Sequence, residues 1–310
     1  MVWRTSKTRE TPKRRRSQHG SIKLAGSRDD SGGSDRVEEA VIWIIVVLVL
    51  SAVAGGVIQR RHFKDRDVND QRAWAEGLRV KELVIPVRLL ASLLLAFVVV
   101  SVFGSYRNTS SQAANEAGAV LAMGEQAVLL SEPARGEVLG SLRCYTRAVA
   151  GPDWEAQAQN GALSPVTDAA ADRINATLRE ATTDPQNASA VAAILDDDAG
   201  RIQARIQRSN EARPTVPNEV WVLMLVTVGV MIGSSAALAH PGVSTSVQYA
   251  LLAGTTLVFG LTLLITYDIG RPFDGFARVN PTAMQNVDHR LANLPGGSDE
   301  PPCDADGRLR

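Results

Sequence analysis

A long stretch near the C-terminus contains no charged side chain. Between Val220 and Tyr267 there is no Asp, Glu, Lys or Arg. A water-soluble fold has few ways to bury so long an apolar stretch, whereas one membrane-spanning helix needs roughly 20 apolar residues. The connection His240-Pro241-Gly242 leaves room only for a tight turn. The stretch therefore predicts two spans that form an antiparallel hairpin.

Two more apolar segments lie upstream, at 41–58 and 84–106. Together with the C-terminal pair they predict an all-α membrane protein with four transmembrane helices, arranged as two hairpins that flank a helical-bundle domain. About forty residues precede the first segment, far more than the n-region of a signal peptide, so we expect a retained anchor. Arg88 falls near the start of the second segment, where a long side chain can reach the headgroups. A pairing or pore-facing role is the alternative for Arg88.

Charge and hydrophobicity divide the chain into five regions. Residues 1–39 include the block Lys13–Arg16 and almost no large apolar side chains, so they predict a disordered basic tail. Such a tail either binds anionic lipid or remains a solvated extension. The other regions are a first transmembrane hairpin with a basic loop (40–106), a helical-bundle soluble domain (107–219), a second transmembrane hairpin (220–267), and an interfacial segment with a disordered C-terminal tail (268–310).

The region 107–219 shows the periodicity of four amphipathic helices. Apolar residues recur at spacings of three or four in four groups: Ala113 to Val128, Val138 to Val149, Val166 to Leu178, and Val191 with Leu195, Ile202 and Ile206. Ser164-Pro165 and Asp184-Pro185 each offer an N-cap followed by proline at the first helical position. Gly151-Pro152 predicts a break. Four such helices pack most simply as a bundle.

Two glycines share one face of the first C-terminal span. Gly229 and Gly233 are separated by three residues, which lets another backbone approach closely. We interpret them as helix-packing residues, although this spacing also arises by chance in apolar helices.

The distribution of basic residues bears on orientation, because cytoplasmic loops are enriched in Lys and Arg. Four crossings place both termini and the helical domain on one side of the membrane. The loop after the first segment is strongly basic, with Arg60, Arg61, Lys64, Arg66, Arg72, Arg79 and Lys81. This loop and the absence of lysine from the domain favour an outward-facing domain, but the N-terminal tail is also basic. The sequence leaves the topology open.

No pattern of catalytic or metal-ligating residues is present. The four histidines, His19, His62, His240 and His289, are scattered along the chain. The run Asp196–Asp198 cannot converge on one cation from consecutive helical positions, so a solvated face is the better interpretation. Cys144 and Cys303 lack metal-ligand spacing or a nearby partner, and they indicate no redox compartment. We expect no enzyme activity, no cofactor, no metal and, because the dense basic block lies in the tail, no nucleic-acid partner.

The C-terminal stretch ends in YDIGRPFDG, where charges meet the apolar run. Asp268 and Arg271 can form a local pair that lowers the cost of lying near hydrocarbon. Pro272 ends the helix, Phe273 suits the interface, and Asp274-Gly275 supplies a turn. The same segment would also serve to line a mouth or to contact the helical domain.

Short motifs along the chain are similar to those of one known family. They are LLLAFVVV (93–100), Glu116-Ala117, Tyr145 with Asp153-Trp154, Val216-Pro217 with Trp221, and Asp268 with Arg271, Pro272, Phe273, Gly275, Val279 and Pro281. In these motifs, over about residues 41–284, the chain resembles the bestrophin-like domain family of bacterial and plant membrane proteins, whose function is unknown. The family usually has Glu at the position of Asp153, which keeps the charge, and the basic N-terminal tail is not part of its pattern.

The resemblance implies two membrane hairpins around a helical domain. Bestrophins themselves are pentameric anion channels with cytosolic termini, so it also implies a homo-oligomer and a cytosolic domain. The candidate functional or structural residues are Arg88, Glu116, Tyr145, Trp154, Trp221, Asp268, Arg271, Pro272, Phe273 and Gly275.

Two functions follow as hypotheses. The first is a homo-oligomeric channel for an anion or another small ion in a bacterial plasma membrane, although no span shows a regular row of polar residues. The second is a non-conducting anchor or sensor, held in the lipid bilayer by its spans, whose helical domain binds a protein partner.

Overall fold

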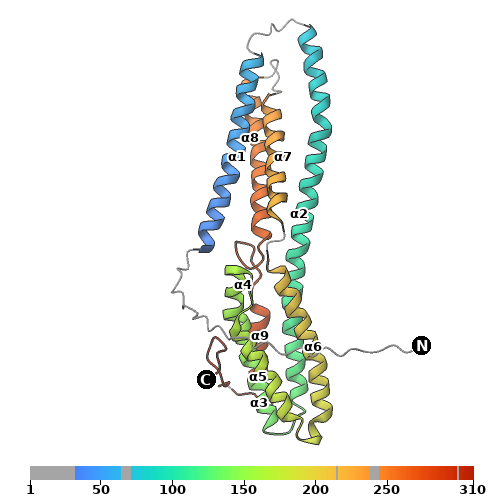
Figure 1. Ribbon diagram of the computed structural model, residues 1–310, viewed down its shortest axis with the longest axis vertical. Coiled ribbons are helices and arrows are strands. Elements are labelled where there is room, and N and C mark those ends of the chain that lie inside the picture. Colours follow the sequence, from blue (N-terminus) through green and yellow to red (C-terminus); the bar gives the residue numbers. More distant parts are fainter. Residues whose placement is uncertain (1–31, 64–70, 214–215, 238–243, 299) are drawn as a thin grey trace, which may run out of the picture. The chain divides into compact units, whose positions relative to one another are not determined.

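The computed structural model describes residues 32–63, 71–213, 216–237, 244–298 and 300–310. This part of the chain is all-helical and contains no β-strand. The helices are α1 (Gly32–Phe63), α2 (Gln71–Ala127), α3 (Ala134–Ala148), α4 (Trp154–Asn160), α5 (Pro165–Ala181), α6 (Ala188–Glu211), α7 (Asn218–Ala237), α8 (Thr245–Ile269) and α9 (Thr282–Ala292) (Figure 1). The block Lys13–Arg16, the centre of the basic loop and His240-Pro241-Gly242 lie outside the described residues.

Helix α2 runs without a break from the apolar part of the protein into the helical domain (Figure 1). Its 57 residues correspond to a length of about 85 Å at 1.5 Å per residue. After Pro86 the helix contains no proline, and its buried row continues with helical spacing from Ala91 through Val102 to Val120. The expected boundary near residue 106 is therefore not a break in the structure.

Three of the described helices are long and apolar enough to cross a membrane. They are the segment Val84–Ala127, which includes the apolar part of α2, then Asn218–Ala237 and Ser246–Ile269. The sequence predicted four spans, and the difference is α1, whose apolar part is limited to Ile42–Ile58. Glu38 and Glu39 precede that part and Arg60 follows it, so it falls short of the usual length of roughly 20 residues.

The apolar helices pack around α7 and α8. Helix α1 packs on α7 and also contacts α8, and α2 contacts both α7 and α8. In Figure 1, α1 and α2 lie on opposite sides of the α7 and α8 pair. The two upstream helices are therefore not packed against each other as a hairpin, because the C-terminal pair lies between them.

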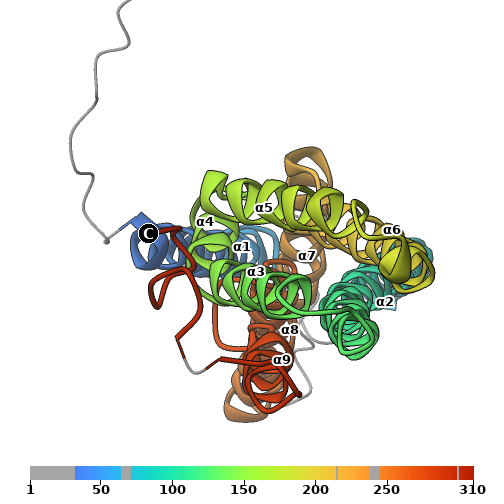
Figure 2. The ribbon, with the colours of Figure 1, turned by 90° about the horizontal axis from the view of Figure 1, so that it is seen from below.

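The helical domain comprises the C-terminal part of α2 with α3 to α6, α9 and the segment after α9 (Figure 2). Ser164 caps α5 by accepting the N–H of Val166, and Asp184 caps the 3-10 turn Pro185–Asn187 that leads into α6. The expected break at Gly151-Pro152 does not occur. A π-helical turn, Val149–Asp153, instead carries α3 into α4.

The C-terminal region differs from the disordered tail that the sequence predicted. Helix α9 buries Met284, Val287 and Leu291 against the domain core. Beyond it, Cys303 forms a disulfide with Cys144 of α3, and their Cα atoms are 5.7 Å apart. Composition alone concealed this segment, because its apolar residues are few and its covalent partner is 159 positions away.

Helix α6 buries a different face from the one that the sequence predicted, although Val191 is buried as expected. Leu195, Ile202 and Ile206, expected to lie in the core, are 48%, 43% and 48% exposed. The buried face instead carries charged side chains, namely Asp198, Arg201, Arg205 and Arg208. The apolar pattern failed here because carboxylates in the core supply partners for the arginines.

Close backbone contact joins α1 to α7. A Cβ atom added at Gly229 would lie 2.8 Å from Oγ of Ser51, and Gly233 faces the Ser51 carbonyl oxygen. On α1, a Cβ atom at Gly55 would meet the carbonyl oxygen of Gly233 and lie 2.7 Å from Cβ of Ala236. The two helices can approach this closely only because side chains are absent.

We expect Gly55→Ala to lower the thermal stability of the purified protein, because overpacking of this kind costs roughly 1–3 kcal/mol. Gly56→Ala is the matched control, since nothing lies within 4 Å of an added Cβ atom there. Tryptophan fluorescence during heating would measure both variants. Equal melting temperatures for the two alanine variants would contradict the close contact.

Candidate functional site

A buried cluster of charges lies in the domain core, centred on Arg208 of α6. Its Nε donates to Oε2 of Glu116 at 2.7 Å, and its Nη2 donates to Oδ2 of Asp153 at 2.8 Å. All three side chains are fully buried. The hydroxyl of Tyr145 donates to the other oxygen of Glu116 at 2.6 Å. Helices α2, α3 and α6 and the π-helical turn therefore meet at one ion-paired point.

Further groups surround this cluster. Asp153 also accepts the N–H of Ser164 at 2.8 Å and a hydrogen bond from Gln157 at 3.1 Å. One turn earlier on α6, Arg205 pairs with Asp168 at 2.8 Å. Arg201 pairs with Asp198 at 2.7 Å and lies over the Tyr145 ring at 4.6 Å. Asp198 is thus buried, which corrects the expectation of a solvated run for this residue, whereas Asp196 is exposed as predicted.

The electrostatics of the cluster shift the pKa values of Tyr145 and Arg208. Burial, followed by the neighbouring Glu116 carboxylate, raises the pKa of Tyr145 well above its ordinary value, so the phenol remains a donor. Burial alone would lower the pKa of Arg208, but attraction by Glu116 and Asp153 outweighs it and raises the pKa. The charged arginine binds both carboxylates in the domain core.

Trp154 connects this cluster to the segment after α8. Its ring lies under the Arg208 guanidinium at 5.2 Å and meets Phe273 edge to face at 5.1 Å. Its Nε1 donates to the carbonyl oxygen of Val279 at 3.0 Å. Pro272 and Phe273 are both buried at this contact. The domain core therefore holds the chain directly where it leaves the last apolar helix.

Asp268 organises the turn that follows α8. Its carboxylate accepts the N–H groups of Phe276 at 2.8 Å and Ala277 at 3.0 Å. Gly275 has φ of 99°, a left-handed conformation that favours glycine, and an added Cβ atom there would collide with the Asp268 carboxylate.

The expected ion pair between Asp268 and Arg271 is not formed. Arg271 instead stacks its guanidinium over the Tyr267 ring at 4.3 Å. The carboxylate satisfies two otherwise unpaired backbone donors, so it is committed to the turn, and the arginine takes the aromatic face.

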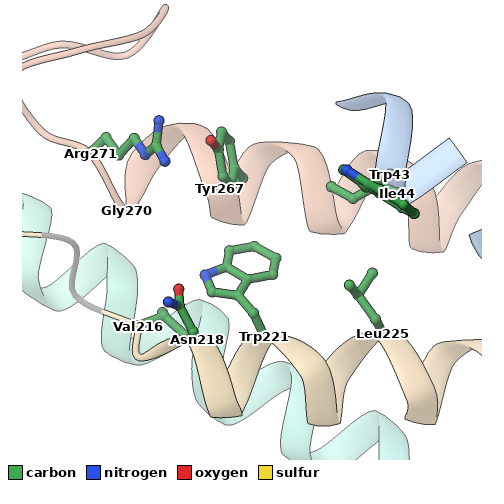
Figure 3. A pocket seen from close by; sticks show the side chains of 9 residues that line it. All are labelled: Trp43, Ile44, Val216, Asn218, Trp221, Leu225, Tyr267, Gly270 and Arg271. Carbon is green, nitrogen blue, oxygen red and sulfur yellow. The ribbon is translucent and has the colours of Figure 1, made fainter. Parts of the chain in front are cut away.

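A cavity of about 220 Å³ lies beside this turn, between α1, α7 and α8. Its lining residues are Trp43, Ile44, Val216, Asn218, Trp221, Leu225, Tyr267, Gly270 and Arg271. Figure 3 shows Trp221 and Tyr267 facing each other, with Arg271 beside Tyr267 at one end. The two rings meet edge to face at 5.7 Å. Aromatic and arginine side chains grouped at the ends of apolar helices are typical of the level of lipid headgroups.

Comparison with known proteins identifies the family. A model of the bestrophin-like domain matches residues 43–284. The chain belongs to the bestrophin-like family. No curated protein and no solved structure matches the chain. Among the residues that the structure describes, three helices are long and apolar enough to cross a bilayer, so this bestrophin-like protein is a membrane protein.

The predicted site residues of the bestrophin-like chain fall into three places. Glu116, Tyr145, Trp154 and Phe273 meet in the domain core, whereas Trp221 and Arg271 line the cavity and Asp268 and Gly275 form the turn between. Arg88 lies apart from them. Its Nη2 donates to Oγ of Ser234 of α7 at 3.4 Å.

Sequence reasoning missed the centre of the cluster. Arg201, Arg205 and Arg208 follow helical spacing on the same face of α6 as the buried Val191 and Ile194. That spacing was the available signal, because a charged stripe continuing an apolar one indicates buried partners elsewhere.

Replacement of Arg208 by Met should destabilise the protein strongly, because it leaves Glu116 and Asp153 buried without a cation. Loss of one partner from a buried pair costs about 3–5 kcal/mol. Arg173→Met, on the exposed face of α5, is the control and should change stability by less than about 0.5 kcal/mol. The readout is the melting temperature in detergent; a wild-type value for the Arg208 variant would mean that the cluster does not hold the fold.

Exchange of the two charges, Asp268→Arg with Arg271→Asp, should disrupt the turn as severely as Asp268→Ala. Arginine at 268 cannot accept the two backbone N–H groups, whereas Arg271→Gln removes only the ring contact. Limited proteolysis after residue 274 would report the loss of the turn. If the exchange restored protease resistance relative to Asp268→Ala, the two side chains would act as a local ion pair.

Proposed function

We propose that this bestrophin-like protein is a homo-oligomeric channel for small ions in a bacterial plasma membrane, with α2 of each copy lining the pathway. The proposal rests on one row of exposed residues along α2, which we call the α2 stripe. Its members are Leu90, Leu93, Phe97, Ser101, Gly104, Asn108, Ser111, Asn115 and Gly118. All follow spacings of three or four, so they share one face of the helix.

The chemistry of the α2 stripe changes along its length. Leu90, Leu93 and Phe97 form an apolar section at the level of the apolar helices, and Asn108 and Asn115 place amides in the domain, where the Asn108 amide donates to Glu211 at 3.0 Å. Apolar constrictions gate ions by dewetting, and polar groups lower the cost of ion passage elsewhere. Helices from several copies around a common axis would supply both parts in series.

Helices α7 and α8 are less suited than α2 to line an ion pathway. Exposed residues of α7 and α8 include Val222, Val226, Leu257 and Val258, which suit contact with lipid. In this proposal α1 is a fourth crossing, completed by helical turns beyond Ile42–Ile58, with α7 and α8 packed between α1 and α2. The family resemblance favours anions as the permeant ions.

Asn115→Asp should shift the reversal potential of purified protein in planar bilayers toward cation preference under a salt gradient, because each copy adds a carboxylate to the pathway. Ser110→Asp adds the same charge to an exposed position of α2 outside the stripe and should leave selectivity unchanged. Absence of wild-type current above empty membranes in several salts, or equal shifts from both variants, would contradict the proposal.

A second function is favoured by a different observation, the exposed apolar row on α6. This α6 stripe consists of Ala192, Leu195, Ala199, Ile202 and Ile206, at the spacing of a coiled-coil seam. Such a face on a membrane-anchored domain would bind a protein partner, as an anchor or sensor requires.

A photo-crosslinking side chain at Ile202, used in native membranes, separates the two functions. Adducts with the mass of two copies support the oligomer, whereas adducts with a different chain support the anchor or sensor. The same group at Gln203, which lies outside the stripe, serves as the control and should give few adducts.

A further inference from the structure

The disulfide between Cys144 and Cys303 joins α3 to the folded C-terminal segment 300–310. Both cysteines are fully buried. Asp304, next to Cys303, accepts the N–H groups of Asp306 and Arg308 at 3.0 and 2.8 Å, and its own N–H donates to the carbonyl oxygen of Arg308 at 3.0 Å. Gly307, with φ of 77°, lies directly against the backbone of α3. The segment is therefore a folded loop that seats its cysteine on α3.

Polar contacts beside the disulfide hold the same surfaces together. Asp288 of α9 pairs with Arg143 at 3.0 Å and with Arg147 at 3.4 Å, on either side of Cys144 along α3. Arg147 also donates to the carbonyl oxygen of Asp304 at 3.4 Å. Because these contacts place the two sulfur atoms together in the folded protein, bond formation needs only an oxidant.

Whether such a disulfide forms depends on the redox conditions of the cellular compartment in which the domain lies. Two thiols lose two protons and two electrons, which pass by thiol exchange to a disulfide-bearing oxidant. Oxidants of this class act in the bacterial periplasm and other extracytoplasmic spaces, whereas cytosolic thiols are kept reduced. A buried structural disulfide therefore indicates that the helical domain lies outside the cytoplasm.

Charge distribution supplies an independent argument. The end of α1, the start of α2 and the connection between them contain seven basic residues from Arg60 to Lys81, and no lysine occurs after Lys81. Five arginines flank the apolar helices on the domain side, namely Arg36, Arg107, Arg213, Arg271 and Arg278, so the larger number of basic residues lies at the opposite end of α2. Because α2 is continuous across the apolar region, that end and the domain lie on opposite sides of the membrane.

The N-terminal tail does not outweigh this asymmetry. Its dense block Lys13–Arg16 is more than twenty residues from the apolar part of α1, and nearer to it, besides Arg36, the tail adds only Lys23 and Arg28. Basic residues orient a protein mainly when they lie within about 15–20 residues of a span.

We infer that the helical domain of this protein faces the extracytoplasmic side, where Cys144 and Cys303 are oxidised, and that the loop between α1 and α2 faces the cytoplasm. This orientation is opposite to the cytosolic domain that the family resemblance implies. It depends on α2 crossing the membrane and not on ion conduction. Whatever the domain binds is then encountered outside the cell or in the periplasm.

The test uses the full chain in intact cells, with the native cysteines retained. Ser189→Cys places a thiol on the exposed start of α6, and Asn69→Cys places one in the basic connection. A membrane-impermeant maleimide should label the first variant in intact cells and the second only after permeabilisation. The wild-type chain should remain unlabelled in both conditions, because its cysteines are buried and bonded.

A second readout reports the bond itself. Cells are treated with a permeant alkylating reagent before lysis, and the protein is then reduced and tagged with a maleimide polymer. Two tags per wild-type chain are expected, and none for Cys144→Ser, whose remaining thiol is blocked at the first step. External labelling of Asn69→Cys instead of Ser189→Cys, or a wild-type chain without tags, would each overturn the inference.

Discussion

The contact of Arg208 with Glu116 and Asp153 is the interaction on which the rest of this structure depends. A charged guanidinium without exposure to water is tolerated only when carboxylates surround it. Those carboxylates come from α2 and from the π-helical turn before α4, so the pairing fixes the mutual position of three segments that are distant in sequence. Trp154 extends this arrangement to Phe273 and hence to the end of α8. The domain and the apolar helices are thereby joined through side chains as well as through α2.

The ion pairs of Arg208 explain why α6 buries charged side chains and leaves three predicted core residues exposed. A helix with both an apolar and a charged stripe can bury either one, and the choice depends on what the neighbouring elements offer. Here α2 and the π-helical turn offer negative charge, and the arginines turn inward. Leu195, Ile202 and Ile206 are left on the surface, which favours contact with another chain.

Local patterns were the part of the fold that the sequence predicted well. The uncharged stretch marked α7 and α8, spacing marked α3 and α5, and Ser164-Pro165 marked the start of α5. The sequence did not predict that α2 continues through residue 106. The composition changes there from apolar to amphipathic, which suggested a boundary, but both halves of α2 favour a helix. Nor did the sequence predict the α6 face or the disulfide, which both depend on partners far away along the chain. Among the site residues, Glu116, Tyr145, Trp154 and Phe273 were found through family motifs, while Arg208 required the assembled core.

The uninterrupted course of α2 has a mechanical consequence. A helix of this length behaves as a stiff rod, so a tilt of about 5° at one end displaces the other by roughly 7 Å. No hinge separates its apolar and domain halves, and Glu116 is locked to the domain core. Any movement at Phe97 must therefore be accompanied by movement of the domain as a rigid body. A displacement of the domain would therefore move the apolar section of α2 by rotation of the whole helix, without rearrangement of the backbone between them.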